Sequence, residues 1–512
     1  MNIYESCKTP IRVAYFGFVL IAIGFLIQNP NVNLFYTFKS SVVLFIGEFS
    51  SKIGEIIVMN LPLIFMLSIV CKKANSGSPL VMALVGYFTF LVTTMLFSNQ
   101  QLSSQAYATG VGVNSVFNIS TGTRLPLETG MIGSLIVAFI TRFSYVTSRN
   151  KNSYSILAFF NKDTAGIIYN VIFCFAGGVA VSYLYPFVYN YIQFAVTYIA
   201  QDLMDPLRIA IYGVLDRLLS IFGLGNIVRY PFWYTSVGGS FSNSLTGQVI
   251  LGDVNIWNYV KDSTATFVGA GRFITPYYVI NMFIVPGIYL GILSSMSDPK
   301  ERHKYFVIFL FAILLSVIAG NPLPLELILL FTSPFLLISY LVLVGTTFGA
   351  FVKLETFLGF SGNATNTTVA MPGSFPDFII NIRNARLSST LTMILIIGLI
   401  ALAVSYFMTT IYYHFFAFDL VKTGSGDELI DKTIEAVGGI DNISNAGSGL
   451  FKVNIALFDL EKVSFDLVQE IGARRVTETR NGITIEFGTS SCIIARRIHR
   501  RIKTFNLNKK GK

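Results

Sequence analysis

Charged residues are scarce in this chain of 512 residues: only 12% are Asp, Glu, Lys or Arg, whereas 53% are hydrophobic. A soluble protein of this length needs far more charge to cover its surface, so a soluble globular fold is excluded. Cysteine is equally scarce, and the four thiols, Cys7, Cys71, Cys174 and Cys492, show no CxxC pair or other paired spacing. We therefore expect free or buried thiols, no metal site and no bound cofactor.

Apolar runs long enough to cross ~30 Å of hydrocarbon recur along the chain. Clear examples are residues 11–28, 79–97, 131–145, 165–185, 306–320 and 391–415. These runs are continuous, whereas a membrane β-barrel would show short alternating strands. We therefore predict a mostly α-helical, polytopic transmembrane bundle of about ten spans. Because no small-residue cleavage site follows the polar residues 1–12, the first span is expected to stay in the membrane.

Charge density rises sharply near residue 426. The last 86 residues hold 25 of the 64 charged residues of the chain. A domain boundary is therefore expected in the Gly/Ser-containing linker 422–426. This places a membrane-embedded domain at 1–421, a small soluble domain at 427–504 and a basic tail at 505–512.

The segment 427–504 is typical of a compact α/β sandwich. Helical spacing of apolar residues predicts helices over 427–437, 463–471 and 490–503, and alternation predicts strands over 450–458, 475–479 and 483–487. Asn481-Gly482 lies between the last two strands and is a strong hairpin signal. We expect two of the helices to cover one face of the small sheet.

Short basic loops set the expected orientation in the membrane. Loops 71–73, 148–151 and 300–304 carry the positive residues that favour the cytoplasmic side, and the charged C-terminal domain is expected there too. The formal net charge of +10 is attributed to these loops and to anionic lipid headgroups, not to nucleic acid. The basic segment 496–503 is expected to be a solvated helix face, with contact to lipid or a regulatory partner as the alternative.

Several short segments occur in a recognisable order. They are Asn60-Leu61-Pro62, residues 83–87, Leu127-Glu128-Thr129-Gly130 with residues 131–133, Phe159-Phe160, Phe222-Gly223-Leu224, residues 231–234, Gly271-Arg272-Phe273, Pro286, residues 298–302, Pro324-Leu325-Glu326, residues 434–443 and residues 470–473. In order and spacing they resemble the glucose-family enzyme II C sugar permeases of the phosphotransferase system (PTS), followed by an enzyme II B domain. The resemblance covers nearly the whole chain.

This resemblance implies a homodimer in a bacterial cytoplasmic membrane, with a transport domain built partly of re-entrant hairpins. A hexose or related sugar would bind near the bilayer midplane, and the B domain would phosphorylate it through a phosphocysteine. Partners would be the sugar, membrane lipid, and the general phosphotransfer proteins or a B protein acting in trans. The Gly- and Pro-rich stretches 223–231 and 320–324 fit re-entrant segments, although they also fit ordinary connecting loops.

The phospho-acceptor of the B domain is missing. The family uses a cysteine at the start of the first strand, because a thiolate is nucleophilic near neutral pH. That position falls on Gly449, and residues 427–491 contain no cysteine. The arginine expected three residues later is Lys452, which keeps the charge but loses the bidentate grip on phosphate. Ser448 is an unactivated hydroxyl, and Cys492 lies far along the chain.

The paired histidines of the membrane site are missing as well. The family's Gly-Leu-His-His segment reads here as Gly223-Leu224-Gly225-Asn226, and all three histidines of the chain lie at position 303 or later. Gly225 and Asn226 are therefore kept as candidate substrate-binding positions. The Asn226 side chain can donate and accept hydrogen bonds toward a sugar, or it can cap a helix.

The resemblance implies two glutamates in the membrane site, and one of them is present. The first falls on Leu323 and the second is Glu326. A carboxylate inside a membrane is costly, so it marks a functional site by default. Glu326 is expected either to accept hydrogen bonds from sugar hydroxyls or to form a structural pair with a residue such as Arg272. Both residues are candidates for the substrate site.

Three hypotheses follow. The preferred one is a PTS-type permease-like protein that binds a hexose or related sugar without phosphorylating it through its own tail. It would either move the sugar across the membrane as a carrier or act as a sugar sensor without transport. The second is active transport coupled to phosphorylation by a B protein in trans. The third is a structural or partner-binding membrane protein with a closed cavity.

Overall fold

The structure is a computed structural model that describes the following residues: 3–28, 40–71, 77–98, 102, 106–107, 124–149, 162–242, 247–261, 268–360, 372–382, 388–416, 426–471, 473, 475–479 and 481–510. The expected linker 422–426, apart from Gly426, and parts of the basic loops 71–73 and 148–151 lie outside the described residues.

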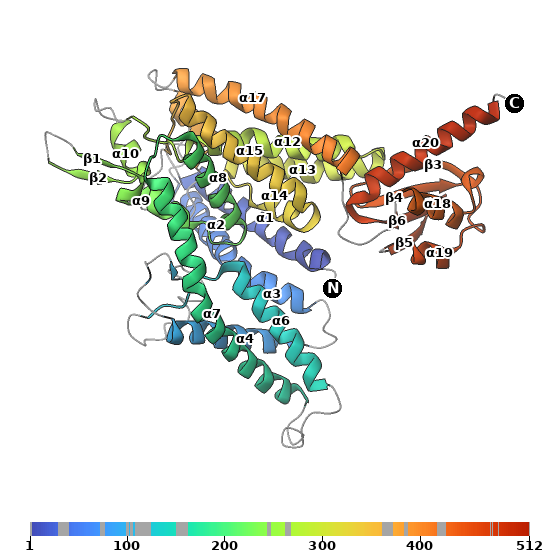
Figure 1. Ribbon diagram of the computed structural model, residues 1–512, viewed down its shortest axis with the longest axis horizontal. Coiled ribbons are helices and arrows are strands. Elements are labelled where there is room, and N and C mark those ends of the chain that lie inside the picture. Colours follow the sequence, from blue (N-terminus) through green and yellow to red (C-terminus); the bar gives the residue numbers. More distant parts are fainter. Residues whose placement is uncertain are drawn as a thin grey trace. The chain divides into compact units, whose positions relative to one another are not determined.

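Long apolar helices dominate the chain (Figure 1). Among the described residues, 8 helices are long and apolar enough to cross a membrane. A ninth span results if α2 (Ser41–Met59) and α3 (Leu61–Cys71), which are bent by 59° at Asn60, are counted together. The expectation of a helical membrane protein is confirmed at this level, and the number of about ten spans stays a prediction.

The chain divides into two compact units. The first comprises residues 1–279, 317–327 and 341–395, and the second comprises 280–316, 328–340 and 396–512. Besides α2 and α3, the elements before the C-terminal domain are α1 (Ile3–Gln28), α4 (Ser78–Phe97), α6 (Gly130–Arg149), α7 (Lys162–Ala200), α8 (Pro206–Ile221), α9 (Asn226–Tyr234), η3 (Ser236–Gly238), β1 (Ser240–Ser242), β2 (Val249–Leu251), α10 (Asp253–Val260), α11 (Thr275–Val279), η4 (Ile280–Ile284), α12 (Val285–Ser295), α13 (Pro299–Ala319), α14 (Leu323–Thr332), α15 (Pro334–Lys353), α16 (Phe375–Ile382), α17 (Ser388–Ile411) and η6 (Tyr412–Phe416).

Glycine lets α1 and α2 approach closely in the first unit. A Cβ atom on Gly24 would lie 2.6 Å from the carbonyl oxygen of Gly47, and one on Gly54 would lie 2.6 Å from that of Gly17. In a membrane the lipid is as apolar as the side chains, so helix association depends on such close packing. These glycines therefore fix the pairing of the first two helices.

α9 and α14 are among the helices that are too short to cross a bilayer. α9 has 9 residues and α14 has 10, which corresponds to roughly 14–15 Å of helix each. α9 follows the turn at Gly223, which has φ +78°, and α14 follows Gly320, which has φ +60°. These are the Gly- and Pro-rich stretches for which the sequence predicts either re-entrant segments or connecting loops.

An aromatic core surrounds α8 and α9. The ring of Tyr212 packs edge-to-face against Phe232, Phe273 and Phe348, with centroid distances of 5.1, 4.7 and 5.5 Å. Tyr212 is completely buried, and its hydroxyl accepts a hydrogen bond of 3.0 Å from the indole N–H of Trp233. Such aromatic pairs have directional preferences, so the core fixes the orientation of α8 against α9.

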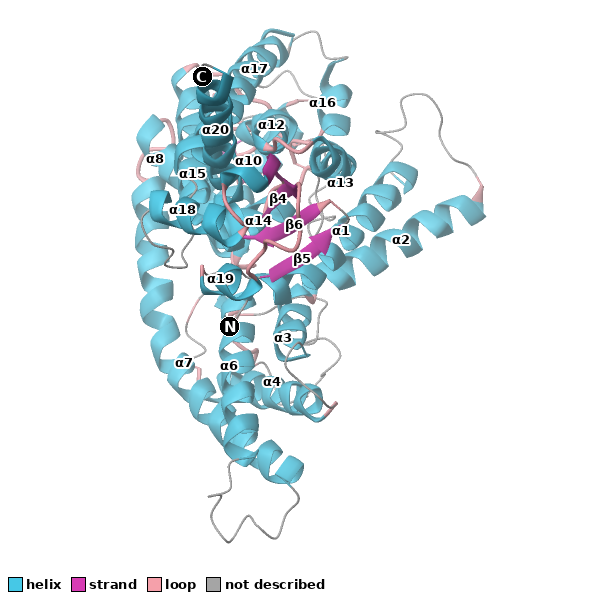
Figure 2. Ribbon diagram, turned by 90° about the vertical axis from the view of Figure 1, so that its right-hand side faces the viewer, coloured by secondary structure: helices cyan, strands magenta, loops and turns pink. Residues whose placement is uncertain are grey.

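The C-terminal part forms an antiparallel sheet with the strand order β3-β4-β6-β5, and Figure 2 shows β4, β6 and β5 of this sheet. Its elements are α18 (Gly426–Ala436), η7 (Ile440–Asn442), β3 (Ile443–Ser448), β4 (Lys452–Leu457), α19 (Phe465–Glu470), β5 (Arg475–Thr479), β6 (Gly482–Glu486), η8 (Gly488–Ser490) and α20 (Ser491–Lys510). Alternate residues of β4, Val453, Ile455 and Leu457, are buried in a core shared with the three helices. This alternation is what a sheet with one apolar face requires.

Most of the expected tail elements are present, with three differences. The hairpin of β5 and β6 pairs Thr479 with Gly482, as the Asn-Gly signal predicts. Strand β3 is not predicted by the sequence, because its residues Asn445, Gly447 and Ser448 are not strand formers by propensity. Three helices, not two, contribute to the core. The last helix, expected to end at residue 503, continues to Lys510.

Candidate functional site

The turn between α8 and α9 brings distant charges together. α8 begins with Pro206 at its first position and with the Asp205 carboxylate accepting a hydrogen bond of 2.9 Å from the Leu207 amide. It ends at Ile221, and Gly223 with φ +78° reverses the chain at a conformation that favours glycine. The last turns of α8 therefore face the first turn of α9, in a helix–turn–helix arrangement.

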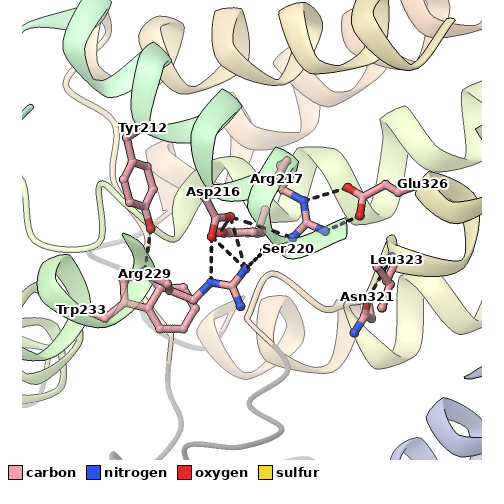
Figure 3. Close-up of polar contacts among 10 residues, drawn as sticks. Tyr212, Asp216, Arg217, Ser220, Arg229, Trp233, Asn321, Leu323 and Glu326 are labelled. Atoms are coloured by element: carbon pink, nitrogen blue, oxygen red, sulfur yellow. Dashed lines mark hydrogen bonds and ion pairs between the residues drawn. The ribbon is translucent and has the colours of Figure 1, made fainter. Parts of the chain in front are cut away.

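The centre of the site is a buried ion pair between α8 and α14 (Figure 3). Arg217 donates from Nε to Oε1 of Glu326 at 2.8 Å and from Nη2 to Oε2 at 2.6 Å. Glu326 is fully buried and Arg217 is only 4% exposed. This two-point geometry is the strong form of an arginine–carboxylate contact, and the low dielectric of the interior strengthens it further.

A second ion pair lies next to the first. Arg229 on α9 donates from Nε to Oδ1 of Asp216 at 3.1 Å and from Nη2 to Oδ2 at 3.2 Å. Its Nη2 also donates to the Ser220 hydroxyl at 2.9 Å, and Tyr277 donates its hydroxyl proton to Asp216. We call Asp216, Arg217, Arg229 and Glu326 together the charge cluster. Its two pairs meet where Arg217 approaches Asp216 to 4.0 Å.

The charge cluster carries no net charge, because two guanidinium groups balance two carboxylates. Asp216 and Glu326 are fully buried, whereas the side chain of Arg229 is 23% exposed. Arg229 is thus the most exposed member of the charge cluster. A cluster with donors, acceptors and no net charge suits an uncharged polar ligand, because a charged ligand would leave an unpaired charge buried.

Of the predicted membrane-site residues, Glu326 lies in the cluster and Arg272 does not. Arg272 donates to the carbonyl oxygens of Gly269 at 2.8 Å, Leu203 at 2.9 Å and Val268 at 3.1 Å. It therefore ties neighbouring backbone segments together. The expected alternative of a pair between Glu326 and Arg272 is wrong, since Arg217 is the partner of Glu326.

Gly225 and Asn226 lie in the turn that leads into α9. A Cβ atom on Gly225 would lie 2.2 Å from the Ser220 hydroxyl oxygen, so glycine permits the close approach of the turn to α8. Asn226 is the exposed first residue of α9, one helical turn before Arg229. Both residues border the charge cluster. Leu323, at the place of the missing glutamate, is half-buried, and its amide donates to Asn321 at 2.9 Å.

Gly449, the tail position that the resemblance aligns with the family's phospho-acceptor, is covered. Gly449 is buried, and a Cβ atom there would lie 3.1 Å from Oε2 of Glu301. Lys452 begins β4, and its carbonyl oxygen accepts from the Gly449 amide at 2.9 Å. The thiol of Cys492, although distant in sequence, lies 3.6 Å from the Gly449 carbonyl oxygen. Burial raises the pKa of the Cys492 thiol to about 11, so it is protonated at neutral pH and a poor nucleophile.

The sequence alone does not single out Asp216, Arg217 or Arg229 as site residues. A signal for them exists, because α8 carries an acidic and a basic residue side by side within an otherwise apolar run, and ionisable residues inside a membrane mark functional sites. The sequence does not show which helix supplies the partner of each charge. No family model matches the chain.

Proposed function

We propose that this protein is a PTS-type sugar permease-like membrane protein. In this proposal it binds a hexose or related sugar and moves it across the cytoplasmic membrane without phosphorylating it through its own tail. The finer features, a homodimer with re-entrant α9 and α14 and a cytoplasmic tail in a bacterial inner membrane, come from the resemblance alone and belong to the same proposal.

One observation carries the proposal: the buried, net-neutral charge cluster lies where two segments of the resemblance meet. Residues 222–226 lead into the helix that supplies Arg229, and the Pro324-Leu325-Glu326 segment supplies the other carboxylate. Sugars are uncharged and rich in hydroxyl groups, so their recognition requires fixed donors and acceptors with no excess charge. Arg229 and Asn226 are the residues that we assign to direct contact with the solute.

The surroundings of Gly449 argue against phosphorylation by the tail. A phosphorylated group there would face the Glu301 carboxylate, which repels a phosphate. The nearby Cys492 thiol is buried and protonated. Transport coupled to phosphorylation would therefore require a separate B protein.

Exchange of sugar by purified protein tests the proposal. Proteoliposomes are loaded with unlabelled glucose, mannose or N-acetylglucosamine, and the uptake of the same labelled sugar is followed by counterflow. We expect exchange by the wild type without phosphotransfer proteins, and Arg229→Lys is expected to weaken binding about ten- to hundredfold by loss of its paired hydrogen bonds. Arg149→Lys, at an exposed ion pair, is the matched control. No exchange of any of the three sugars would contradict the proposal.

A further inference from the structure

A half-buried carboxylate, Glu128, lies outside the charge cluster. Glu128 precedes α6, and its Oε1 accepts a hydrogen bond of 3.2 Å from the Gly130 amide. Asp253 and Asp377, which are more deeply buried, have donors of their own. Asp253 accepts from two backbone amides, at 2.8 and 3.3 Å, and Asp377 accepts from the Tyr278 hydroxyl. Within the described residues, Glu128 forms no ion pair.

The sequence around Glu128 offers it no cation. Between positions 74 and 128 the only lysine, arginine or histidine is Arg124. Arg124 is exposed and donates to the carbonyl oxygen of Leu96 at 3.2 Å. α7 carries no charged residue from position 164 to its end, and the nearest basic residue on α6 is Arg142, roughly 18 Å further along the helix axis. An ionised Glu128 would therefore be a half-buried charge with no cation beside it in the described part of the chain.

Two tyrosines lie near this carboxyl. Tyr87 on α4 and Tyr185 on α7 are close enough to be influenced by its charge, and the Tyr185 hydroxyl is buried without a hydrogen-bond partner among the described residues. Tyr107 and Tyr189 lie near Tyr185 in turn, and Ser134 on α6 lies near Tyr87. Burial raises the pKa of Glu128, because its single backbone donor does not offset the loss of water.

The backbone beside Glu128 is joined to the proposed sugar site. The Met131 amide donates to the carbonyl oxygen of Phe222 at 2.9 Å, directly at the turn that leads to Gly225 and Arg229. Leu127 and Leu224 share one buried cluster. A change in the charge of Glu128 therefore acts on the start of α6, which is in direct contact with this turn.

We propose that Glu128 binds a proton whose uptake and release are coupled to sugar movement, so that the protein is a proton-coupled sugar carrier. This inference rests on the proposed function. One proton is taken from the side of higher acidity onto the carboxylate, crosses with one sugar molecule, and leaves the carboxyl on the other side. The free energy of the proton gradient is the driving force, so no covalent step and no further reactant are required.

Proteoliposomes test the coupling with the same three sugars. We expect the wild type to accumulate sugar when the outside is more acidic, up to about tenfold for a difference of one pH unit. Glu128→Gln mimics the protonated carboxyl, so it should retain exchange without a gradient but lose the gradient-driven accumulation. Glu48→Gln, which changes an exposed carboxylate on α2, should behave as the wild type.

The outcomes separate the two proposals. If the wild type exchanges no sugar, the proposed function fails and the coupling fails with it. If the wild type exchanges sugar but does not accumulate it in a pH gradient, only the proton coupling is overturned. This comparison uses the wild-type protein alone. Accumulation by Glu128→Gln equal to that of the wild type would assign the proton to another group. An infrared carbonyl band of a protonated carboxyl at neutral pH, lost in Glu128→Gln, is expected in addition.

Discussion

Neutralising Glu326 tests whether the charge cluster holds the first unit together. Glu326→Gln keeps the size of the side chain but leaves the Arg217 guanidinium, only 4% exposed, without its two-point partner. Removing one member of a buried ion pair leaves an uncompensated charge, which costs about 3–5 kcal/mol. The exposed pair of Arg149 and Asp163, at 3.2 Å, is the control, and Asp163→Asn should cost about 1 kcal/mol or less.

The double variant Arg217→Met/Glu326→Met sharpens this test. Because both buried charges are removed together, the double variant should regain most of the stability that Glu326→Gln loses, but it should not exchange sugar. Unfolding in mixed micelles, with denaturing detergent as the titrant and the fluorescence of the two tryptophans as the signal, measures the free energies. If Glu326→Gln cost no more than Asp163→Asn, the pair would not be the buried, dry contact that its geometry indicates.

Three further predictions concern glycine and cysteine positions. Gly449→Cys should react slowly with an alkylating reagent at neutral pH and faster when combined with Glu301→Gln, because the carboxylate near the new side chain disfavours the thiolate; equal rates would contradict this. Alkylation of the native Cys492 should rise only as the pH approaches about 11 and should be rapid after denaturation. Gly130→Ala should destabilise the protein by about 1–3 kcal/mol in the micelle assay, since Gly130 has φ +50° and its Cβ would lie 2.2 Å from a backbone oxygen, whereas Gly77→Ala in open space should be neutral.

The sequence predicts the helices and strands of this chain better than it predicts which of them pack or pair with one another. Long apolar runs are found as helices, because an apolar helix of sufficient length satisfies all of its own backbone hydrogen bonds in a membrane. The charge step near residue 426 coincides with the start of α18. The sequence does not reveal strand β3, because its burial depends on pairing with β4, which supplies five partner residues with a register shift between Ile443 and Asn445. Propensity is local, whereas strand pairing is a property of the folded sheet.

In the site, too, the sequence identifies single residues but not the residues that they contact. Glu326 is identifiable as a costly intramembrane carboxylate, but its partner, Arg217, lies 109 positions away and is revealed only by the packing of α8 against α14. Arg272 is as buried as Arg217, and its backbone partners make it structural. Burial and charge thus mark the candidates, and the hydrogen-bond partners decide between a role in the site and a role in the scaffold.

The two carboxyl sites differ in a way that bears on mechanism. In the charge cluster every charged side chain has a partner at 2.6 to 3.2 Å, so each one is held in a fixed position. Glu128 has a backbone donor and two tyrosines nearby but no paired cation among the described residues, so its charge can change at a smaller cost. A fully paired cluster is suited to hold a solute, whereas a carboxyl without a cation is suited to exchange a proton. The contact of Met131 with the turn at Phe222 is what joins these two tasks in one unit.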